Sequence, residues 1–168
     1  MFLSQSKVFD APWIYFNEKD NPNLIFNRFY EVGNFSREMI CKNNGAICLE
    51  ISCSKGDELW KKSDEELFKT CMTYLEKNNF LSREKVKHIL TKRLEVAYPV
   101  FKVGYHSRLK NPLRFLVNRG DIVCIGRQGL FSYANIDHCI DMGLKVEELL
   151  SESANPKDFY KIYKNYLF

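Results

Sequence analysis

The sequence predicts an α+β fold, with a mainly antiparallel sheet and helices packed on it in a single domain of residues 1–168. Three apolar, aromatic-rich runs follow one another before any helical pattern appears, which favours an antiparallel meander over a βαβ unit. From residue 63 the apolar spacing becomes helical. The chain has 168 residues, of which 45% are hydrophobic and 27% are charged. A chain of this length can bury one hydrophobic core without disulfide bonds or a structural metal ion.

The first strands are predicted from apolar runs bounded by turn residues. Residues 13–16 lie between Pro12 and a polar stretch, and residues 24–30 are followed by Gly33. Residues 46–52 follow the turn signal Asn44-Gly45 and are expected to pair with the preceding strand.

Two helices are expected next. Ser63 and Glu66 have the spacing of a capping box, and the apolar residues that follow predict a helix that ends at Asn78-Asn79. Ser82 opens a second, shorter helix that extends to Leu90.

Strand character then returns before a final pair of helices. Residues 94–101 predict a strand with Pro99 at an edge, an end or a bulge, because proline cannot donate to a ladder. Pro112 breaks a mixed segment that contains one short helix. The remaining predictions are a buried strand at 121–125, an amphipathic helix from Asn135 or Ile136 to Leu150, and a C-terminal helix at 155–168 that opens on Asn155-Pro156.

Composition argues against several function classes. The net charge is +4 with the two signs interspersed, so no basic stripe indicates nucleic-acid binding. No apolar run approaches the roughly 20 residues of a membrane span, and the first residues lack the pattern of a secretory signal, which predicts a soluble cytoplasmic protein. The six cysteines form no Cys-x-x-Cys pair and predict buried, reduced thiols rather than a metal site.

The segment from Asp121 to Leu150 offers the clearest candidate for chemistry. A strand ends at Gly126, Arg127 adds a cation with two parallel donors, and the following helix begins with unpaired N–H groups that attract anions. Asn135 and Asp137 could equally be local helix caps, so spacing alone leaves a structural loop and an anion or cofactor site both open. The chain has no G-x-G-x-x-G fingerprint, no P-loop and no G-x-S-x-G elbow.

Residues 126–150, GRQGLFSYANIDHCIDMGLKVEELL, resemble the last cofactor-contacting segment of flavin-dependent amine oxidase-like proteins. That group includes protoporphyrinogen oxidase-like enzymes and UDP-galactopyranose mutases. Residues 27–36, 49–60 and 93–105 resemble further segments of the group in the same order, so the resemblance extends from about residue 13 to residue 150.

The resemblance implies a set of site residues and assigns no catalytic residue. It places cofactor contacts at Gly126, Arg127, Asn135, Ile136 and Asp137, and substrate contacts at Arg28, Tyr98 and Tyr133. Structural alternatives remain for two of these: Tyr98 as a core or edge aromatic, and Arg28 as a partner of Glu31 or Glu50.

The resemblance also implies that the chain is the C-terminal portion of an FAD-dependent, amine oxidase-like oxidoreductase. Its last strand–loop–helix unit would complete an FAD-binding domain, and the Rossmann half would come from an N-terminal segment or a separate subunit. The chain would act on a small-molecule substrate only when so completed. One alternative is a portion of a nucleotide-sugar mutase, which residues 50–54 disfavour because they hold no second arginine. Another is a non-catalytic interaction module, which predicts a monomer–dimer equilibrium through an exposed apolar patch and no affinity for flavin. A homo-oligomer is therefore among the expected assemblies.

Overall fold

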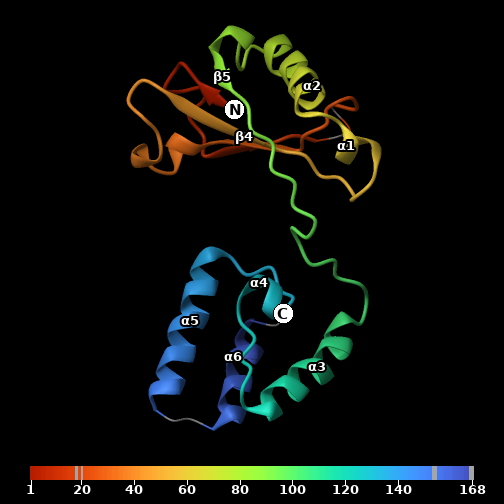
Figure 1. The fold of residues 1–168 in the computed structure, drawn as a ribbon, viewed down its shortest axis with the longest axis vertical. Coiled ribbons are helices and arrows are strands. Elements are labelled where there is room, and N and C mark those ends of the chain that lie inside the picture. Colours follow the sequence, from red (N-terminus) through yellow and green to blue (C-terminus); the bar gives the residue numbers. More distant parts are fainter. Residues whose placement is uncertain (18, 20, 153–154, 167–168) are drawn as a thin grey trace. The chain divides into compact units, whose positions relative to one another are not determined.

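The computed structural model describes residues 1–17, 19, 21–152 and 155–166, and it has the predicted α+β fold (Figure 1). The chain divides into two compact units, unit 1 at Met1–Glu95 and unit 2 at Val96–Phe168. Each unit contains its own cluster of buried apolar side chains. We expected a single domain without a clear internal boundary. The division between the two units falls within residues 89–101, which join no sheet.

Unit 1 is built on a five-stranded sheet with the order β2-β3-β4-β1-β5, in which every pair is antiparallel. The strands are β1 (Phe2–Leu3), β2 (Trp13–Tyr15), β3 (Arg28–Glu31), β4 (Gly45–Glu50) and β5 (Val86–His88). The expected meander is therefore confirmed in β2, β3 and β4. Strand β1 was not expected, because a two-residue strand has no period to detect.

The expected helix at 82–90 is wrong. Its residues form a 3-10 turn, η3 (Arg83–Lys85), and then strand β5, which pairs with β1. Pairing with β1 satisfies the backbone groups of this segment, which a helix would otherwise have to satisfy internally. Three other short helices are η1 (Val32–Asn34), η2 (Arg37–Met39) and α1 (Glu58–Lys61).

Helix α2 (Asp64–Lys77) covers one face of the sheet (Figure 1). The predicted capping box is confirmed, because the Glu66 N–H donates to Ser63 Oγ at 3.2 Å and the Ser63 N–H donates to Glu66 Oε2 at 2.8 Å. Phe29 and Ile47 of the sheet are buried against Met72 and other residues of α2. The opposite face of the sheet therefore keeps its polar and aromatic side chains outside this core.

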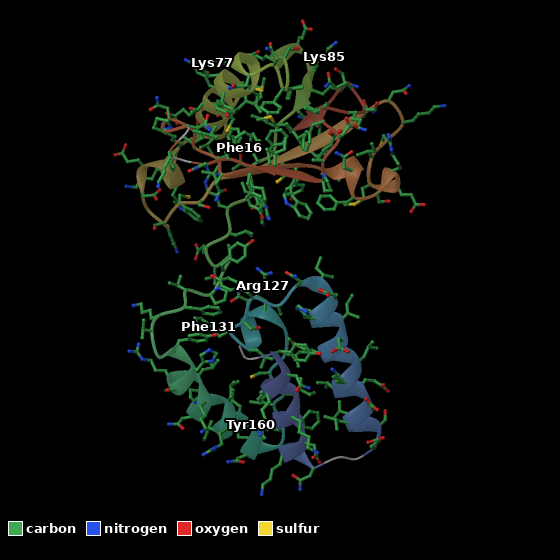
Figure 2. The ribbon with its side chains drawn as sticks, turned by 180° about the vertical axis from the view of Figure 1, so that it is seen from behind. Phe16, Lys77, Lys85, Arg127, Phe131 and Tyr160 are labelled. Atoms are coloured by element: carbon green, nitrogen blue, oxygen red, sulfur yellow. The ribbon has the colours of Figure 1, made fainter. Side chains whose placement is uncertain are left out.

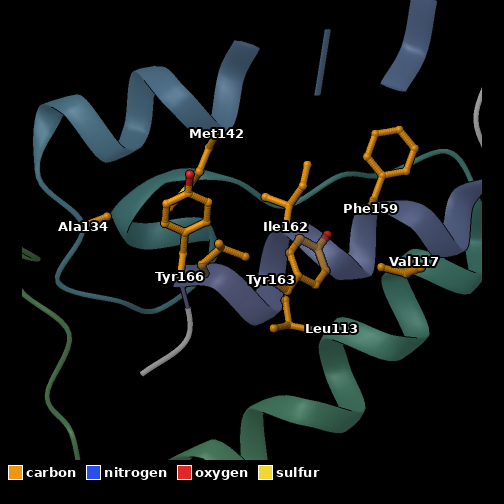
Figure 3. Packing of buried hydrophobic residues seen from close by; sticks show 9 residues of the cluster. Leu113, Val117, Ala134, Met142, Phe159, Ile162, Tyr163 and Tyr166 are labelled. Atoms are coloured by element: carbon orange, nitrogen blue, oxygen red, sulfur yellow. The ribbon is translucent and has the colours of Figure 1, made fainter. Parts of the chain in front are cut away.

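Unit 2 is helical in its described part. Its helices are α3 (Tyr105–Arg119), α4 (Gly126–Gly129), α5 (Ile136–Ser151), η4 (Pro156–Asp158) and α6 (Phe159–Tyr166). Figure 3 shows Tyr163 and Tyr166 of α6 packed among buried side chains of α3 and α5, which include Leu113 and Met142. Helices α5 and α6 confirm two expected helices within the described residues; the last two residues of the expected C-terminal helix lie outside them.

Three predictions in unit 2 and the segment that precedes it are wrong. Residues 94–101 and residues 121–125 form no strand, because neither segment has a neighbouring strand with which to pair. Helix α3 continues through Pro112, although proline removes one helical hydrogen bond. Burial of Leu113 and Val117 on the same helix holds that turn in place.

Among the described residues, no helix is both long and apolar enough to cross a membrane. The expected burial of the cysteine thiols is confirmed for Cys71, whereas Cys41 and Cys53 are exposed on loops. Burial raises the pKa of the Cys71 thiol to about 12, which keeps that thiol protonated and unreactive at neutral pH.

Candidate functional site

Three residues that the resemblance singled out lie together in unit 2. The guanidinium carbon of Arg127 lies 4.9 Å from the centre of the Tyr98 ring, and the Tyr98 and Tyr133 ring centres are 6.0 Å apart. The Tyr133 hydroxyl donates to the Pro99 carbonyl at 3.1 Å, which ties the loop after α4 to the segment that precedes α3. We call Tyr98, Gly126, Arg127 and Tyr133, with the beginning of α5, the Arg127 site.

Arg127 is held in place by its own loop. Its Nε donates to the Ala134 carbonyl at 3.0 Å, and the half-buried side chain lies over the Tyr98 ring. Among the described residues, no carboxylate lies within ion-pair distance of Arg127. The guanidinium therefore keeps its net positive charge and two terminal nitrogens available to an anion.

Gly126 shapes the backbone at the start of α4. Its φ is +76°, in the left-handed region that side chains rarely adopt. A Cβ at this position would meet only the Cys139 sulfur at 3.9 Å, so the space beside Gly126 is open. Conformation, rather than crowding within unit 2, is the reason that glycine suits this position.

The first turn of α5 presents further donors. The Asn135 N–H donates to His138 Nδ1 at 3.2 Å, so Asn135 takes part in capping as the structural alternative predicted. The N–H groups of Ile136 and Asp137 donate to none of the described residues. The exposed Asp137 carboxylate, 3.9 Å from His138, opposes an anion here. Ile136 and Asp137 could therefore serve a ligand only through their backbone.

Sequence reasoning missed an aromatic cluster beside Tyr133. Phe101 and Tyr105 stack with ring centres 4.2 Å apart, and Phe101 lies 4.6 Å from the Tyr133 ring. Phe131 lies 5.7 Å from Phe101 and has a φ of +50°. Figure 2 shows Arg127 and Phe131 at the same end of unit 2, with Tyr160 at the opposite end. A strained bulky residue in a loop of this kind is typical of functional segments.

Ser132 is the second missed residue. Its side chain is 3% exposed, and its Oγ has no hydrogen-bond partner among the described residues. The Ser132 N–H donates to the Arg127 carbonyl at 3.0 Å, so this serine belongs to the same loop as the Arg127 site. A buried hydroxyl without a partner costs free energy, and a bound polar group could restore that bond. A single serine between aromatic residues gave no signal in the sequence.

Arg28 lies in unit 1, on the sheet face opposite α2. It forms an ion pair with Glu50, its partner across β3 and β4, and donates to the Tyr15 hydroxyl at 2.9 Å. The hydrogen bond to Glu50 raises the pKa of Arg28 further above its already high value. The structural alternative for Arg28 is confirmed: its charge is neutralised by Glu50, which makes it a weaker anion ligand than Arg127.

Tyr30 on the same face has a perturbed hydroxyl. It lies directly across from Cys48 in the ladder, and a hydrogen bond with that side chain, together with burial, raises the pKa of Tyr30 to about 12. Trp13 packs beside it through Phe35, whose ring stacks on the indole at 6.0 Å. The sheet face opposite α2 therefore carries aromatic rings together with an Arg28–Glu50 ion pair whose charges neutralise each other.

The comparisons with known proteins support the fold. No family model matches the chain, and a search of the curated proteins found no match. Among solved structures, the chain is similar to a reduced UDP-galactopyranose mutase, with a TM-score of 0.68 and 21% sequence identity. The match covers 96% of this chain and 36% of the mutase chain, so the chain spans about a third of that protein's length. The likeness is one of fold: this chain folds like part of a UDP-galactopyranose mutase.

Proposed function

We propose that this chain is the substrate-sheet and cofactor-closing portion of an FAD flavoenzyme. The observation that best supports the proposal is the meeting of Tyr98, Arg127 and Tyr133 in unit 2. The resemblance had assigned these residues to flavin and substrate contacts from separate segments. The likeness of fold to part of a UDP-galactopyranose mutase supports the same proposal.

The Arg127 site fits one side of such a cofactor. Arg127 has no carboxylate partner among the described residues, Gly126 leaves open space beside its backbone, and Ser132 has a buried hydroxyl without a partner. These groups suit the polar, anionic part of FAD. The glycine-rich turn that grips a dinucleotide pyrophosphate is absent from the sequence. The rest of the cofactor site therefore belongs to another polypeptide segment, either N-terminal to this one or on a separate subunit.

The residues of this chain would bind the cofactor and orient the substrate. Arg127 would hold an anionic or polar group of the cofactor, and the N–H groups of Ile136 and Asp137 would donate to cofactor oxygens. Tyr98 and Tyr133 would line the side on which a small-molecule substrate sits. FAD, when bound, would supply the redox or nucleophilic chemistry itself.

Two reaction classes remain within this proposal. The structural neighbour favours a nucleotide-sugar mutase, in which Arg127 would be the cation nearest to a diphosphate. The ion pair between Arg28 and Glu50 favours amine oxidase-like oxidation instead. Because Glu50 neutralises Arg28, the described part of the sheet face opposite α2 has no unpaired arginine to bind the diphosphate of a nucleotide sugar. Turnover of a UDP-sugar, as against oxidation of an amine, by the completed enzyme distinguishes the two.

Substitution of Arg127 tests the proposal directly. With FAD titrated into the completed enzyme and flavin fluorescence followed, Arg127→Ala is expected to raise the Kd about tenfold, which corresponds to the loss of one charge-assisted hydrogen bond. Arg119→Ala is the matched control, because Arg119 is exposed and pairs with Asp121 on the loop after α3. An equal effect of the two substitutions on FAD binding, or a completed enzyme that binds no flavin, would contradict the proposal.

A further inference from the structure

One peptide bond of the Arg127 site, between Ala134 and Asn135, is held by side chains on both of its sides. Its carbonyl oxygen, on Ala134, accepts a hydrogen bond from Arg127 Nε at 3.0 Å. Its N–H, on Asn135, donates to His138 Nδ1 at 3.2 Å. The carbonyl and the N–H of a trans peptide point in opposite directions. Arg127 and His138 are therefore joined through a single peptide group.

Other contacts fix the Ala134–Asn135 peptide within its loop. The Ala134 side chain is 6% exposed and belongs to the buried cluster of unit 2. The Asn135 carbonyl accepts the Cys139 N–H at 3.0 Å, at the start of α5. Hydrogen bonds in a chain polarise one another, so a peptide whose N–H has an acceptor offers a stronger carbonyl acceptor. The acceptor on His138 therefore strengthens the bond that orients Arg127.

His138 can accept this bond in one protonation state only. In a neutral imidazole one ring nitrogen accepts while the other carries the proton, so the Nδ1 acceptor places the proton of His138 on Nε2. An imidazolium carries a proton on both nitrogens and would turn a donor towards the Asn135 N–H, which breaks the bond. The side chain is 42% exposed, so protons from solvent reach the ring.

Two groups on α5 act on the His138 ring in opposite directions. Asp137 Oδ2 lies 3.9 Å from His138 Nε2 and favours the imidazolium, but the Asp137 side chain is 78% exposed and solvent screens the pair. The Asn135 N–H and the positive end of the helix dipole favour the neutral ring. The neutral ring is the form that caps α5.

Helix α6 packs beside the same ring. The Tyr166 ring centre lies 6.2 Å from the His138 ring centre. Lys145 Nζ donates to Asp141 Oδ2 at 2.7 Å and to the Tyr166 hydroxyl at 3.0 Å, so these three groups satisfy one another. Because Asp141 compensates the charge of Lys145, Arg127 is the cation of this group that a protonated His138 would repel.

We propose that His138 is a positioning residue of the Arg127 site: its neutral ring holds the Ala134–Asn135 peptide so that the Arg127 guanidinium is oriented for an anion, and protonation of the ring releases that peptide. The inference rests on the proposed function, in which the anion is part of FAD. The contact of Arg127 with the Tyr98 ring does not involve His138, so the expected loss is partial.

The position of His138 in α5 makes this bond sensitive to pH. It is the third residue of the helix, where a capping box ordinarily has Glu or Gln. Neither of those side chains ordinarily changes charge between pH 5 and 8, whereas histidine is the side chain that does. Acidification is therefore expected to weaken the hold of the Arg127 site on an anion.

Substitutions of His138 separate the hydrogen bond from the charge. With FAD titrated into the completed enzyme at about pH 7.5, His138→Ala is expected to raise the Kd about fivefold through loss of one hydrogen bond. His138→Gln keeps an acceptor at the capping position and is expected to bind within about twofold of the native enzyme. At about pH 5.5 the native Kd is expected to be about fivefold above that of His138→Gln at the same pH.

A second substitution decides whether His138 acts through Arg127. In enzyme that already carries Arg127→Ala, His138→Ala is expected to change the Kd less than about twofold, because the guanidinium that the peptide orients is gone. His88→Ala, at an exposed histidine of β5 in unit 1, is the matched control and is expected to leave the Kd unchanged. Thermal transitions of all variants check that they are folded.

Nuclear magnetic resonance of the purified full chain tests the link without any cofactor. The His138 ring signals are expected to show the proton on Nε2 at neutral pH. On acidification, the signals of the Asn135 amide and of Arg127 Nε–H are expected to shift with the same midpoint as the ring. In His138→Gln neither signal is expected to shift over that pH range.

Three outcomes would overturn the inference. These are an Asn135 amide signal that does not follow the His138 ring, equal Kd values for His138→Ala and His138→Gln, and an undiminished effect of His138→Ala in enzyme that carries Arg127→Ala. Failure of the proposed function is separate. If Arg127→Ala leaves FAD binding unchanged while the Asn135 and Arg127 signals follow the ring, the function is refuted and the coupling of His138 to Arg127 stands.

Discussion

The side chains of the Arg127 site show how one residue's surroundings decide its role. Arg28 and Arg127 are both arginines beside tyrosine rings, 5.4 Å from the Tyr15 ring centre and 4.9 Å from the Tyr98 ring centre. Glu50 neutralises Arg28, whereas the Arg127 guanidinium donates to the Ala134 carbonyl and has no carboxylate partner among the described residues. The net charge that a ligand would meet therefore differs, although the sequence shows the same residue type in both places.

The raised pKa of Tyr30 leads to a prediction at the same scale. Because the hydrogen bond with Cys48 contributes most to the shift, Cys48→Ala is expected to bring the pKa of Tyr30 down from about 12 towards 10. Ultraviolet absorbance titration of the tyrosines measures the change.

The sign of the accompanying stability change follows from linkage. A tyrosine with a folded-state pKa near 12 holds its proton more tightly than the unfolded chain, so stability falls as the pH rises from 10 to 12. In Cys48→Ala this fall should be shallower. An unchanged titration curve in Cys48→Ala would show that burial alone perturbs Tyr30.

At the scale of elements, short sequence patterns predicted the structure correctly where the stabilising hydrogen bonds join residues that are close in the chain. Helix α2 begins at the capping box that the sequence predicted, because both of its bonds lie within four residues. The strands at 94–101 and 121–125 were predicted from equally apolar runs and did not form, because a strand needs a partner and composition does not supply one.

The capping box of α2 predicts a measurable loss. Ser63→Ala removes the acceptor for the Glu66 N–H and is expected to lower the free energy of unfolding by about 1 kcal/mol. Urea denaturation followed by circular dichroism measures it. Thr73→Ala, at an exposed position within α2 that caps nothing, is the control, and a larger loss in the control would contradict this account.

For the whole molecule, the separation of two cores is the main organising fact. One cluster gathers around the sheet and α2, and the other gathers around α3, α5 and α6. Each has its own fully buried residues, such as Leu75 in unit 1 and Met142 in unit 2. A substitution that destabilises one core is therefore expected to lower the stability of its own unit first.

Cavity-forming substitutions test that separation. Leu75→Ala is expected to destabilise unit 1 by about 2–5 kcal/mol, and Met142→Ala should do the same in unit 2. Hydrogen exchange resolved by peptide is expected to accelerate in the substituted unit and to change little in the other. Equal acceleration across both units would mean that they unfold as one.

The amino-acid sequence by itself determined the fold class, the β2–β3–β4 meander, helix α2 with its cap, and helices α5 and α6. These features depend on period, turn residues and caps, which are local in the chain. It also pointed to Gly126, Arg127, Tyr98 and Tyr133, through a resemblance of short segments. Only the tertiary structure decided that the last three meet, that Glu50 neutralises Arg28, and that residues 121–125 remain unpaired. Those outcomes depend on contacts between residues far apart in the chain, and no local pattern encodes which partner is present.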